Sequence, residues 1–234
     1  MKRLLACLGM LTAATLLPSG ITHAQTRNFI TSDAGAYWWV DAGAAIPQDG
    51  HLTEFGIWNS GQKVSYDVGC ALDLGLGYAF NKYVSTELQW GGTWNEIHSV
   101  EGASLNDTSF GTMPILANLI LQYPIPQTRV VPYVGGGVGG AATFFDTDGF
   151  YAHVPGGAVE IHGSDSDFVF AWQGLAGVRV DLNRQASLGL GYRFLYADAS
   201  SFSYDSWYHG APNLNVKFSS FESHIVSLTF RMKF

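Results

Sequence analysis

The sequence predicts an all-β protein, an eight-stranded antiparallel up-and-down transmembrane β-barrel. Three observations support this fold: apolar and polar residues alternate, charges are few, and short connections alternate with long ones. Of the 234 residues, 47% are hydrophobic and 14% aromatic, but only 13% are charged. Soluble domains carry about 25% charged residues. The composition therefore fits strands whose outer face lies in lipid.

The alternation is complete over the last nine residues. Apolar residues occupy every second position there: Val226, Leu228, Phe230, Met232 and Phe234. The positions between them are Ser227, Thr229, Arg231 and Lys233. Successive side chains of a strand point to opposite faces, so this segment is a strand with one apolar and one polar face. A two-faced strand that ends on an aromatic residue fits the closing seam of a transmembrane barrel.

The same period of two predicts eight strands in all. They cover residues 36–46, 66–80, 83–95, 110–123, 129–145, 167–182, 185–197 and 222–234. The second is the clearest, because Leu72, Leu74 and Leu76 share one face and Asp73 and Gly75 share the other. The register of the first, fourth and fifth strands stays undecided at this stage.

The connections between these segments fall into two classes. Short connections lie at 81–83, 124–128 and 183–185, and long ones at 47–65, 96–109, 146–166 and 198–221. Transmembrane barrels combine short periplasmic turns with long extracellular loops. An even number of strands would leave both ends of the barrel domain on the periplasmic side.

A soluble barrel of lipocalin type is the main rival, and it reverses the two faces. Strand length favours the membrane, because the segments exceed the roughly 9–11 residues that a tilted strand needs to span it. Aromatic residues gather at both ends of the apolar band, as in interfacial girdles: Phe80, Tyr83, Tyr123 and Phe234 at the turn end, and Trp94, Phe144, Phe168 and Tyr196 at the loop end. The polar face is rich in small residues, which suits a narrow interior.

The N-terminus reads as a cleaved signal peptide over residues 1–24, which leaves the barrel domain at 25–234. Met1-Lys2-Arg3 is positively charged, Leu4 to Leu17 is mostly apolar, and Thr22-His23-Ala24 provides a cleavage site. The apolar run is shorter than the ~20 residues of a membrane-spanning helix. Export across the inner membrane is therefore expected.

Several motifs resemble the small outer-membrane barrels of the OmpA transmembrane-domain and opacity-protein superfamily. They are Leu74-Gly-Leu-Gly-Tyr-Ala-Phe80, Pro132-Tyr-Val-Gly-Gly-Gly-Val-Gly139, Leu188-Gly-Leu-Gly-Tyr-Arg-Phe194 and Leu228-Thr-Phe-Arg-Met-Lys-Phe234. The resemblance implies a place in the outer membrane of a Gram-negative-type bacterium, in contact with lipid and lipopolysaccharide. It also implies that Leu228, Phe230, Met232 and Phe234 form the signal read by the outer-membrane assembly machinery.

The predicted inner face carries eight charges: Asp41, Asp73, Glu87, Arg179, Asp181, Arg193, Arg231 and Lys233. Side chains fill the interior of an eight-stranded barrel, and a buried charge without a partner costs several kcal/mol. We therefore expect Arg231 to meet Asp41, and Arg179 and Arg193 to meet Glu87 or Asp73. Such a network is either an electrostatic plug that fixes the register or a gated path for ions.

The long connections are strongly acidic. They hold eleven acids against the two bases Lys63 and Lys217, namely Asp49, Glu54, Glu96, Glu101, Asp107, Asp146, Asp148, Glu160, Asp165, Asp198 and Asp205. This excess disfavours nucleic-acid binding. It is compatible with a repulsive solvated surface, with divalent-cation bridging to lipopolysaccharide, or with a basic partner. The loop aromatics Trp58, Phe150, Tyr151, Trp207 and Tyr208 are either adhesive contacts or packing within the loops.

No catalytic, cofactor or metal site is expected. His162 with Ser164 and Asp165, and His224 with Ser223 and Glu222, have suitable residue types for hydrolysis only as local coincidences. Gly135, Gly137 and Gly140 fit the dinucleotide-binding spacing, but no strand-to-helix switch follows them. The expected function is a structural or surface-interaction role in envelope integrity, adhesion or host contact. The alternatives are a narrow pore and, third, a lipid A-modifying enzyme.

Overall fold

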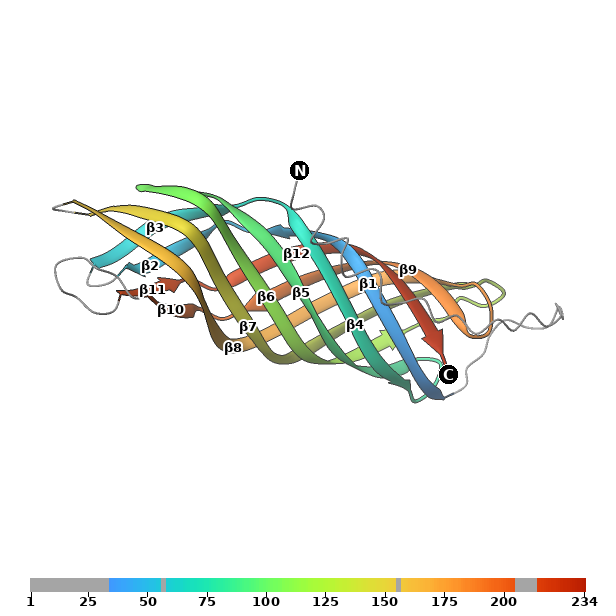
Figure 1. Cartoon of the computed structure of the whole chain (residues 1–234). Coiled ribbons are helices and arrows are strands. Elements are labelled where there is room, and N and C mark those ends of the chain that lie inside the picture. The colour runs from blue at the N-terminus through green and yellow to red at the C-terminus, as the bar shows by residue number, and fades with distance from the viewer. Residues whose placement is uncertain (1–33, 56–57, 155–156, 205–213) are drawn as a thin grey trace.

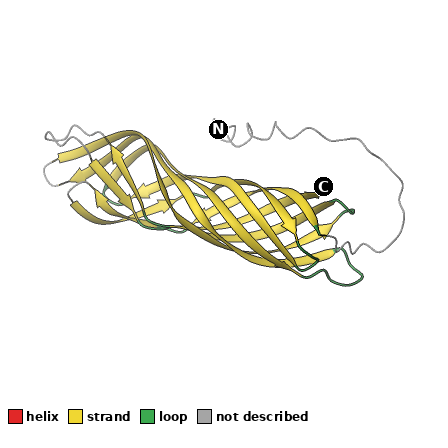
Figure 2. Ribbon diagram, turned by 90° about the horizontal axis from the view of Figure 1, so that it is seen from below, coloured by secondary structure: helices red, strands yellow, loops and turns green. Residues whose placement is uncertain are grey.

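The computed structural model describes residues 34–55, 58–154, 157–204 and 214–234, and they form an antiparallel β-structure (Figures 1 and 2). The predicted signal peptide lies outside these residues. The strands are β1 (Gly35–Pro47), β2 (Gly50–Phe55), β3 (Trp58–Tyr66), β4 (Gly69–Ala79), β5 (Val84–Val100), β6 (Ala103–Gln122), β7 (Val130–Val154), β8 (Gly157–Asp181), β9 (Ala186–Ala197), β10 (Ser200–Tyr204), β11 (Leu214–Phe218) and β12 (Phe221–Lys233). Within the described ranges, no helix has the length and apolar character to cross a membrane.

Eight of these strands close into a ring, here called the main barrel. Its order is β1, β4, β5, β6, β7, β8, β9 and β12, and β12 returns to pair with β1. Val40 of β1 lies opposite Phe230 of β12 at this closing seam. The eight-stranded antiparallel barrel predicted from the sequence is confirmed, and each predicted strand overlaps one strand of the ring.

Asparagine side chains shape two of the short turns at one end of the main barrel, the turn end. The Asn81 Oδ1 atom accepts hydrogen bonds from the backbone N–H groups of Tyr83 and Val84, at 2.7 and 3.0 Å. Asn183 does the same for Gln185 and Ala186, at 2.8 and 2.7 Å. A short polar side chain that binds its own backbone two or three residues ahead favours a tight turn.

The segments predicted as long loops are largely strand, and this part of the prediction is corrected. β2 and all but the last residue of β3 arise within 47–65, and β10 and β11 within 198–221, while β5 to β8 continue past their predicted ends. The added strands form the ladder β10-β11-β2-β3-β5. Together with the far parts of β5 to β8, they form a distal barrel stacked on the main barrel, at the end away from the C-terminus (Figure 1).

The two barrels have opposite interiors, although several strands run through both. On β7, the outward residues change from Val134 and Val138 to the exposed Asp146. The inward residues change from glycines to the fully buried Phe145 and Phe150. The period of two persists as far as Thr147, where a register shift brings Phe150 to the inner face. The polarity of the two faces reverses along the strand, so the distal barrel suits water outside and the main barrel suits lipid.

Candidate functional site

The outer surface of the main barrel is broadly apolar. Leu76 and Leu228 are more than 60% exposed, and the aromatic girdle residues Phe80 and Phe234 at the turn end are also exposed. A continuous apolar surface of this kind on a closed barrel matches contact with hydrocarbon. Of the predicted assembly signal, Leu228, Phe230 and Met232 lie along this outward row of β12, and Phe234 directly follows the strand. Phe230 packs on Trp38 with ring centroids 5.6 Å apart.

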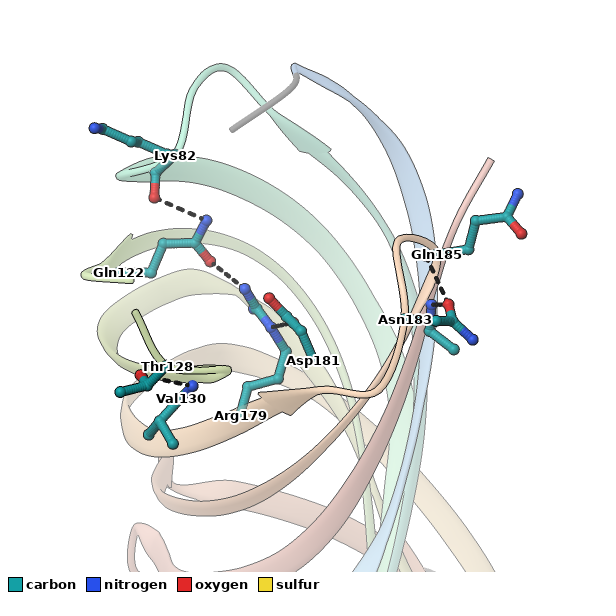
Figure 3. Close-up of polar contacts among 9 residues, drawn as sticks. Lys82, Gln122, Thr128, Val130, Arg179, Asp181, Asn183 and Gln185 are labelled. Carbon is teal, nitrogen blue, oxygen red and sulfur yellow. Dashed lines mark hydrogen bonds and ion pairs between the residues drawn. The ribbon is translucent and has the colours of Figure 1, made fainter. Parts of the chain in front are cut away.

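The inner surface is polar, and its first layer lies at the turn end. The Arg179 Nε atom lies 3.3 Å from Asp181 Oδ1, and the same guanidinium donates to Gln122 Oε1 at 3.1 Å (Figure 3). Gln122 in turn donates to the Lys82 backbone carbonyl at 3.4 Å. This series of contacts joins β8, β6 and the β4–β5 turn. Lys233 lies at the same end, opposite Tyr37 in the β1–β12 register.

The next layer contains Arg231, and here one expected pair is wrong. The guanidinium carbon of Arg231 lies 3.3 Å from the centre of the Tyr37 ring, and Tyr37 Oη donates to Glu87 Oε1 at 2.7 Å. Asp41 instead accepts from Ser227 Oγ at 2.9 Å. Arg231 lies directly opposite Trp39, so Tyr37 and Asp41 are its two diagonal neighbours, and the guanidinium takes the aromatic one.

A third layer lies in the middle of the lumen. Arg193 forms an ion pair with Asp73, which also accepts from Gln89 Nε2 at 2.9 Å. Asn118 Nδ2 donates to Gln89 Oε1 at 3.1 Å, and Gln173 Nε2 donates to both Gln89 Oε1 and Asn118 Oδ1, at 2.6 and 2.7 Å. We call Gln89, Asn118 and Gln173 the amide belt. With the ion pair it joins five strands, and all five side chains are buried.

The amide belt was not among the predicted site residues. The sequence does place these residues on the inner face, because Gln89 shares its strand face with Glu87, and Gln173 shares its face with Arg179. Amides carry no formal charge, so a search for inward charges passes over them. Of the predicted contacts, the structure brings Arg193 to Asp73, whereas Arg179 lies with Asp181 rather than with Glu87 or Asp73.

A small cavity of about 70 Å³ lies between the turn-end layer and the amide belt. Its lining reaches from Arg179 and Arg231 at one side to Gln89 and Arg193 at the other, with Trp39, Asp41 and Glu87 between them.

Beyond the amide belt the lumen holds a few buried polar side chains, such as Thr93 and Thr112, and then the apolar core of the distal barrel. Phe110 packs on Phe221 and Phe145 on Phe218, each pair with ring centroids 5.1 Å apart. Phe202 joins the same cluster and is fully buried. The lumen therefore contains two packed layers, one of hydrogen-bonded polar side chains and one of aromatic rings.

On the surface of the distal barrel, acidic side chains outnumber basic ones. Lys63 Nζ lies 2.6 Å from Asp49 Oδ2, and Lys217 Nζ lies 2.6 Å from Glu54 Oε2, so both bases of these segments are already paired. The hydrogen bond from Lys63 lowers the pKa of the exposed Asp49 carboxyl.

Of the loop aromatics, one packs within the distal barrel and another is exposed, where it could contact a partner. Phe150 is fully buried in the distal core, where it stacks on Phe55, whereas Tyr151 remains 37% exposed. Trp207, Tyr208 and the side chain of Trp58 lie outside the part of the chain that the structure describes.

The candidate hydrolytic groups are dispersed. Ser223 points inward and is fully buried, whereas the adjacent His224 faces outward and contacts Tyr192 Oη through Nδ1 at 2.7 Å. Asp165 accepts from the Ser203 backbone, and His162 Nδ1 lies 2.7 Å from the Asp148 carbonyl oxygen. Among the described residues, no group of three or more His, Cys, Asp or Glu side chains is placed to hold a metal ion.

Comparison with solved structures finds the same fold in proteins of low sequence identity. The outer membrane protein OprG from Pseudomonas aeruginosa aligns with a TM-score of 0.58 and 16% identity, covering 87% of this chain and 99% of OprG. Neisserial surface protein A aligns with a TM-score of 0.53 and 17% identity, covering 86% of this chain and 99% of that protein. Comparison with curated proteins gives no significant match.

The sequence itself matches a family description along nearly its whole length. Residues 5–234 match the family described as outer membrane protein beta-barrel domain. The ring of eight antiparallel strands, the apolar outer wall and the polar lumen agree with that match. The chain belongs to the outer membrane protein beta-barrel domain family.

Proposed function

We propose that this protein is a non-conducting structural and surface-interaction protein of the outer membrane. The observation that supports this proposal is the packing of two layers across the lumen, the amide belt and the aromatic core. A solute crossing the barrel would have to break a buried hydrogen-bonded layer and then pass through packed aromatic rings. We expect both layers to oppose an aqueous path.

The distal barrel is the part that meets other molecules. Short turns face the periplasm in barrels of this class, so the distal barrel stands outside the cell, and the cleaved leader delivers the chain for export. Its outward side chains are mostly polar, and its acids outnumber its bases. Acids such as Asp146 and Asp148 suit divalent-cation bridges to the phosphates of lipopolysaccharide, or a basic patch on a host or surface partner. A rigid strand scaffold presents them with little entropy to lose on binding.

Planar-bilayer recording tests the closed lumen. The purified, refolded protein is expected to give no stepwise current across the bilayer, under conditions in which an open porin in a parallel chamber gives steps. Regular single-channel steps, still present in preparations freed of other porins, would contradict the proposal and favour the narrow pore.

Binding to lipopolysaccharide tests the surface role. The double variant Asp146→Asn and Asp148→Asn is expected to weaken calcium-dependent binding to lipopolysaccharide vesicles. Asp181→Asn is the matched control, because it removes an acid at the turn end, away from the distal surface. Equal binding by all three proteins, with and without calcium, would contradict cation bridging and leave a basic partner as the occupant of this surface.

A further inference from the structure

A groove of about 740 Å³ lies on the outer wall of the main barrel, across β4 to β7. Its lining includes three small outward residues on neighbouring strands, Thr86, Ala117 and Gly136. Large outward side chains border them, namely Leu76, Tyr78, Leu88, Leu119 and Val138, all of which are exposed. Pockets that hold small ligands have volumes of roughly 300–1,000 Å³, so the groove is large enough to hold part of another molecule.

The register of the strands explains the groove. Ala117 of β6 pairs with Leu88 of β5 and with Val138 of β7, and Gly136 pairs with Leu119. Small and large residues therefore alternate across the sheet, and the small position moves by two residues from each strand to the next. A Cβ atom added at Gly136 would lie 3.4 Å from its nearest neighbour. A diagonal depression in the wall follows from this pattern.

The position of the groove indicates what surrounds it. Thr86 lies near the start of β5 and Leu119 near the end of β6, so the groove lies in the turn-end half of the apolar wall. It is continuous with the lipid-facing surface of the main barrel. Atoms that line an empty space lose their van der Waals contacts, and acyl chains are the molecules that surround this wall. The surroundings therefore supply an acyl chain as the occupant.

A polar and aromatic cluster follows at the turn end of these strands. The Tyr83 ring stacks on the Tyr123 ring with centroids 6.3 Å apart, and Lys82 Nζ lies 4.9 Å from the centre of the Tyr83 ring. In Figure 3 the Lys82 side chain points away from Gln122, which binds the Lys82 backbone carbonyl. Tyrosine is enriched at the level of lipid headgroups. The Lys82 ammonium therefore lies outside the lumen, beside a tyrosine pair suited to that level.

The charge of the short turns favours an anionic headgroup. Residues 80–83, 123–129 and 182–185 include the bases Lys82, Arg129 and Arg184 and no acidic residue. Lysine binds phosphate as a point charge. An anionic phospholipid therefore fits the turn end better than a zwitterionic one, whose headgroup carries its own positive charge.

We propose that the groove and Lys82 form a binding site for one anionic phospholipid. An acyl chain lies along Thr86, Ala117 and Gly136, the tyrosine pair lies at the glycerol level, and the Lys82 ammonium binds the phosphate. The site gives the general lipid contact of the wall a fixed position and a headgroup preference. Its assignment to the periplasmic leaflet rests on the orientation given under the proposed function. The site itself rests on the groove and the charge beside it.

Native mass spectrometry of the full protein in detergent tests the headgroup preference. The anionic probe is dioleoylphosphatidylglycerol, and the zwitterionic probe is dioleoylphosphatidylcholine. One phosphatidylglycerol is expected to bind about fivefold more tightly than phosphatidylcholine, the factor that one lysine contributes at an anionic lipid surface. Lys82→Gln is expected to abolish this preference, whereas the control Arg184→Gln, which removes the same charge at the β8–β9 turn, keeps it. Equal affinities for the two lipids in the unaltered protein, or equal losses in the two variants, would overturn the proposal.

A matched pair of alanines tests the groove in the same experiment. Ala117→Leu fills the groove and is expected to weaken binding of both lipids about fourfold or more, the factor for one methylene group removed from apolar contact. Ala42 of β1 is also exposed on the outer wall but lies outside the groove lining, so Ala42→Leu is expected to leave binding unchanged. Equal affinities in the two variants would overturn the site. A protein dimer that Ala117→Leu abolishes, with no lipid retained, would also overturn it and assign the groove to a second copy of the chain.

Photo-crosslinking covers the case in which a variant does not fold, because it uses the unaltered protein in vesicles. A phosphatidylglycerol with a diazirine in its acyl chain is expected to label the peptides that carry Thr86 and Ala117 more strongly than those that carry Leu188 and Phe230. The latter two residues pair with each other near the turn end of β9 and β12, away from the groove. Uniform labelling around the wall would overturn the site.

The two proposals fail separately. Current steps across a bilayer would overturn the closed lumen and leave the phospholipid site intact. A silent barrel that shows neither lipid selectivity nor localised crosslinking would overturn the phospholipid site alone.

Discussion

Single inward side chains decide how the lumen of the main barrel is filled. Gly137 lies on the inner face of β7 beside the amide belt, and a Cβ atom added there would lie 1.8 Å from Asn118 Oδ1. Gly174 of β8 pairs with the neighbouring Gly136 and faces outward, and an added Cβ would have no atom within 4 Å. The packing of the belt therefore requires glycine at position 137, whereas the outer wall has room for a larger residue at position 174.

These two glycines give a matched pair of substitutions. Gly137→Ala is expected to lower the free energy of unfolding by about 1–3 kcal/mol, the usual cost of overpacking. Gly174→Ala is expected to leave stability unchanged or slightly raised, because alanine restricts the unfolded chain. Urea unfolding in lipid vesicles, followed by tryptophan fluorescence, measures both. A loss at Gly174→Ala as large as at Gly137→Ala would contradict the close packing of the belt.

The buried ion pair gives a second residue-scale prediction. Asp73→Ala leaves the Arg193 guanidinium buried without a carboxylate, which costs about 3–5 kcal/mol in comparable proteins. The double variant Asp73→Leu and Arg193→Met is expected to recover much of this loss, since no charge is then left buried. Asp49→Ala is the control at an exposed pair, where only a small, salt-sensitive change is expected. Urea unfolding in lipid vesicles measures the free energy of unfolding of each variant. A double variant no more stable than Asp73→Ala would contradict the prediction.

At the scale of elements, the distal barrel has one seam without a backbone ladder. β8 pairs with β9 only over Ala171–Asp181, and in the structure's described ranges its earlier part reaches β10 through side chains. The Ser203 backbone N–H donates to Asp165 Oδ2 at 2.7 Å, and the Ser201 N–H donates to Asp167 Oδ2 at 2.8 Å. Two carboxylates thus take the place of backbone carbonyls and hold the last gap closed.

Removing these carboxylates is expected to loosen β10. In the variant Asp165→Ala and Asp167→Ala, amide exchange at Ser201 and Ser203 should rise about tenfold or more, since a hydrogen bond to a charged group contributes about 1.5–3 kcal/mol. Asp198→Ala is the control, because within the described part of the chain the Asp198 carboxylate accepts from the backbone of the next residue, at 2.9 Å, and does not cross the seam. Hydrogen–deuterium exchange resolves these amides, and unchanged protection in the double variant would show that packing alone closes the seam.

At the scale of the whole molecule, the same strands pass from a lipid environment in the main barrel to water in the distal barrel. Where lipid surrounds the barrel, apolar side chains face outward and polar ones fill the lumen; where water surrounds it, this arrangement is reversed. Phe145 of β7 and Phe168 of β8 show the difference, being 0% and 67% exposed on neighbouring strands. The same residue type therefore contributes to stability through protein packing at one site and through lipid contact at the other.

This reversal predicts different costs for the same truncation. Phe145→Ala is expected to destabilise the protein by about 3–5 kcal/mol, because it leaves a cavity in a packed core. Phe168→Ala should cost much less, because lipid chains fill the space. Unfolding in lipid vesicles measures the two free energies, and equal losses would contradict the assignment of the distal interior as a packed core.

Much of the main barrel could be predicted from the sequence, because it depends on local pattern. Eight two-faced segments, asparagine-rich turns and aromatic girdles are each visible within a few residues, and the strands around Leu76 and Phe230 lie where the pattern placed them. The contacts of the candidate site were harder to predict from the sequence. The inward positions were identifiable from parity, but the partners were not, as Arg231 on Tyr37 and the amide belt show.

The sequence by itself determined that the chain forms two-faced strands, each with one apolar and one polar face. Only the tertiary structure decided the distal barrel, its carboxylate seam and the luminal contacts. The physical reason is that a period of two reports that neighbouring residues point in opposite directions, and does not report which direction is inward. That choice, and the meeting of side chains from strands far apart in sequence, follow from barrel closure, register and the solvent outside the wall.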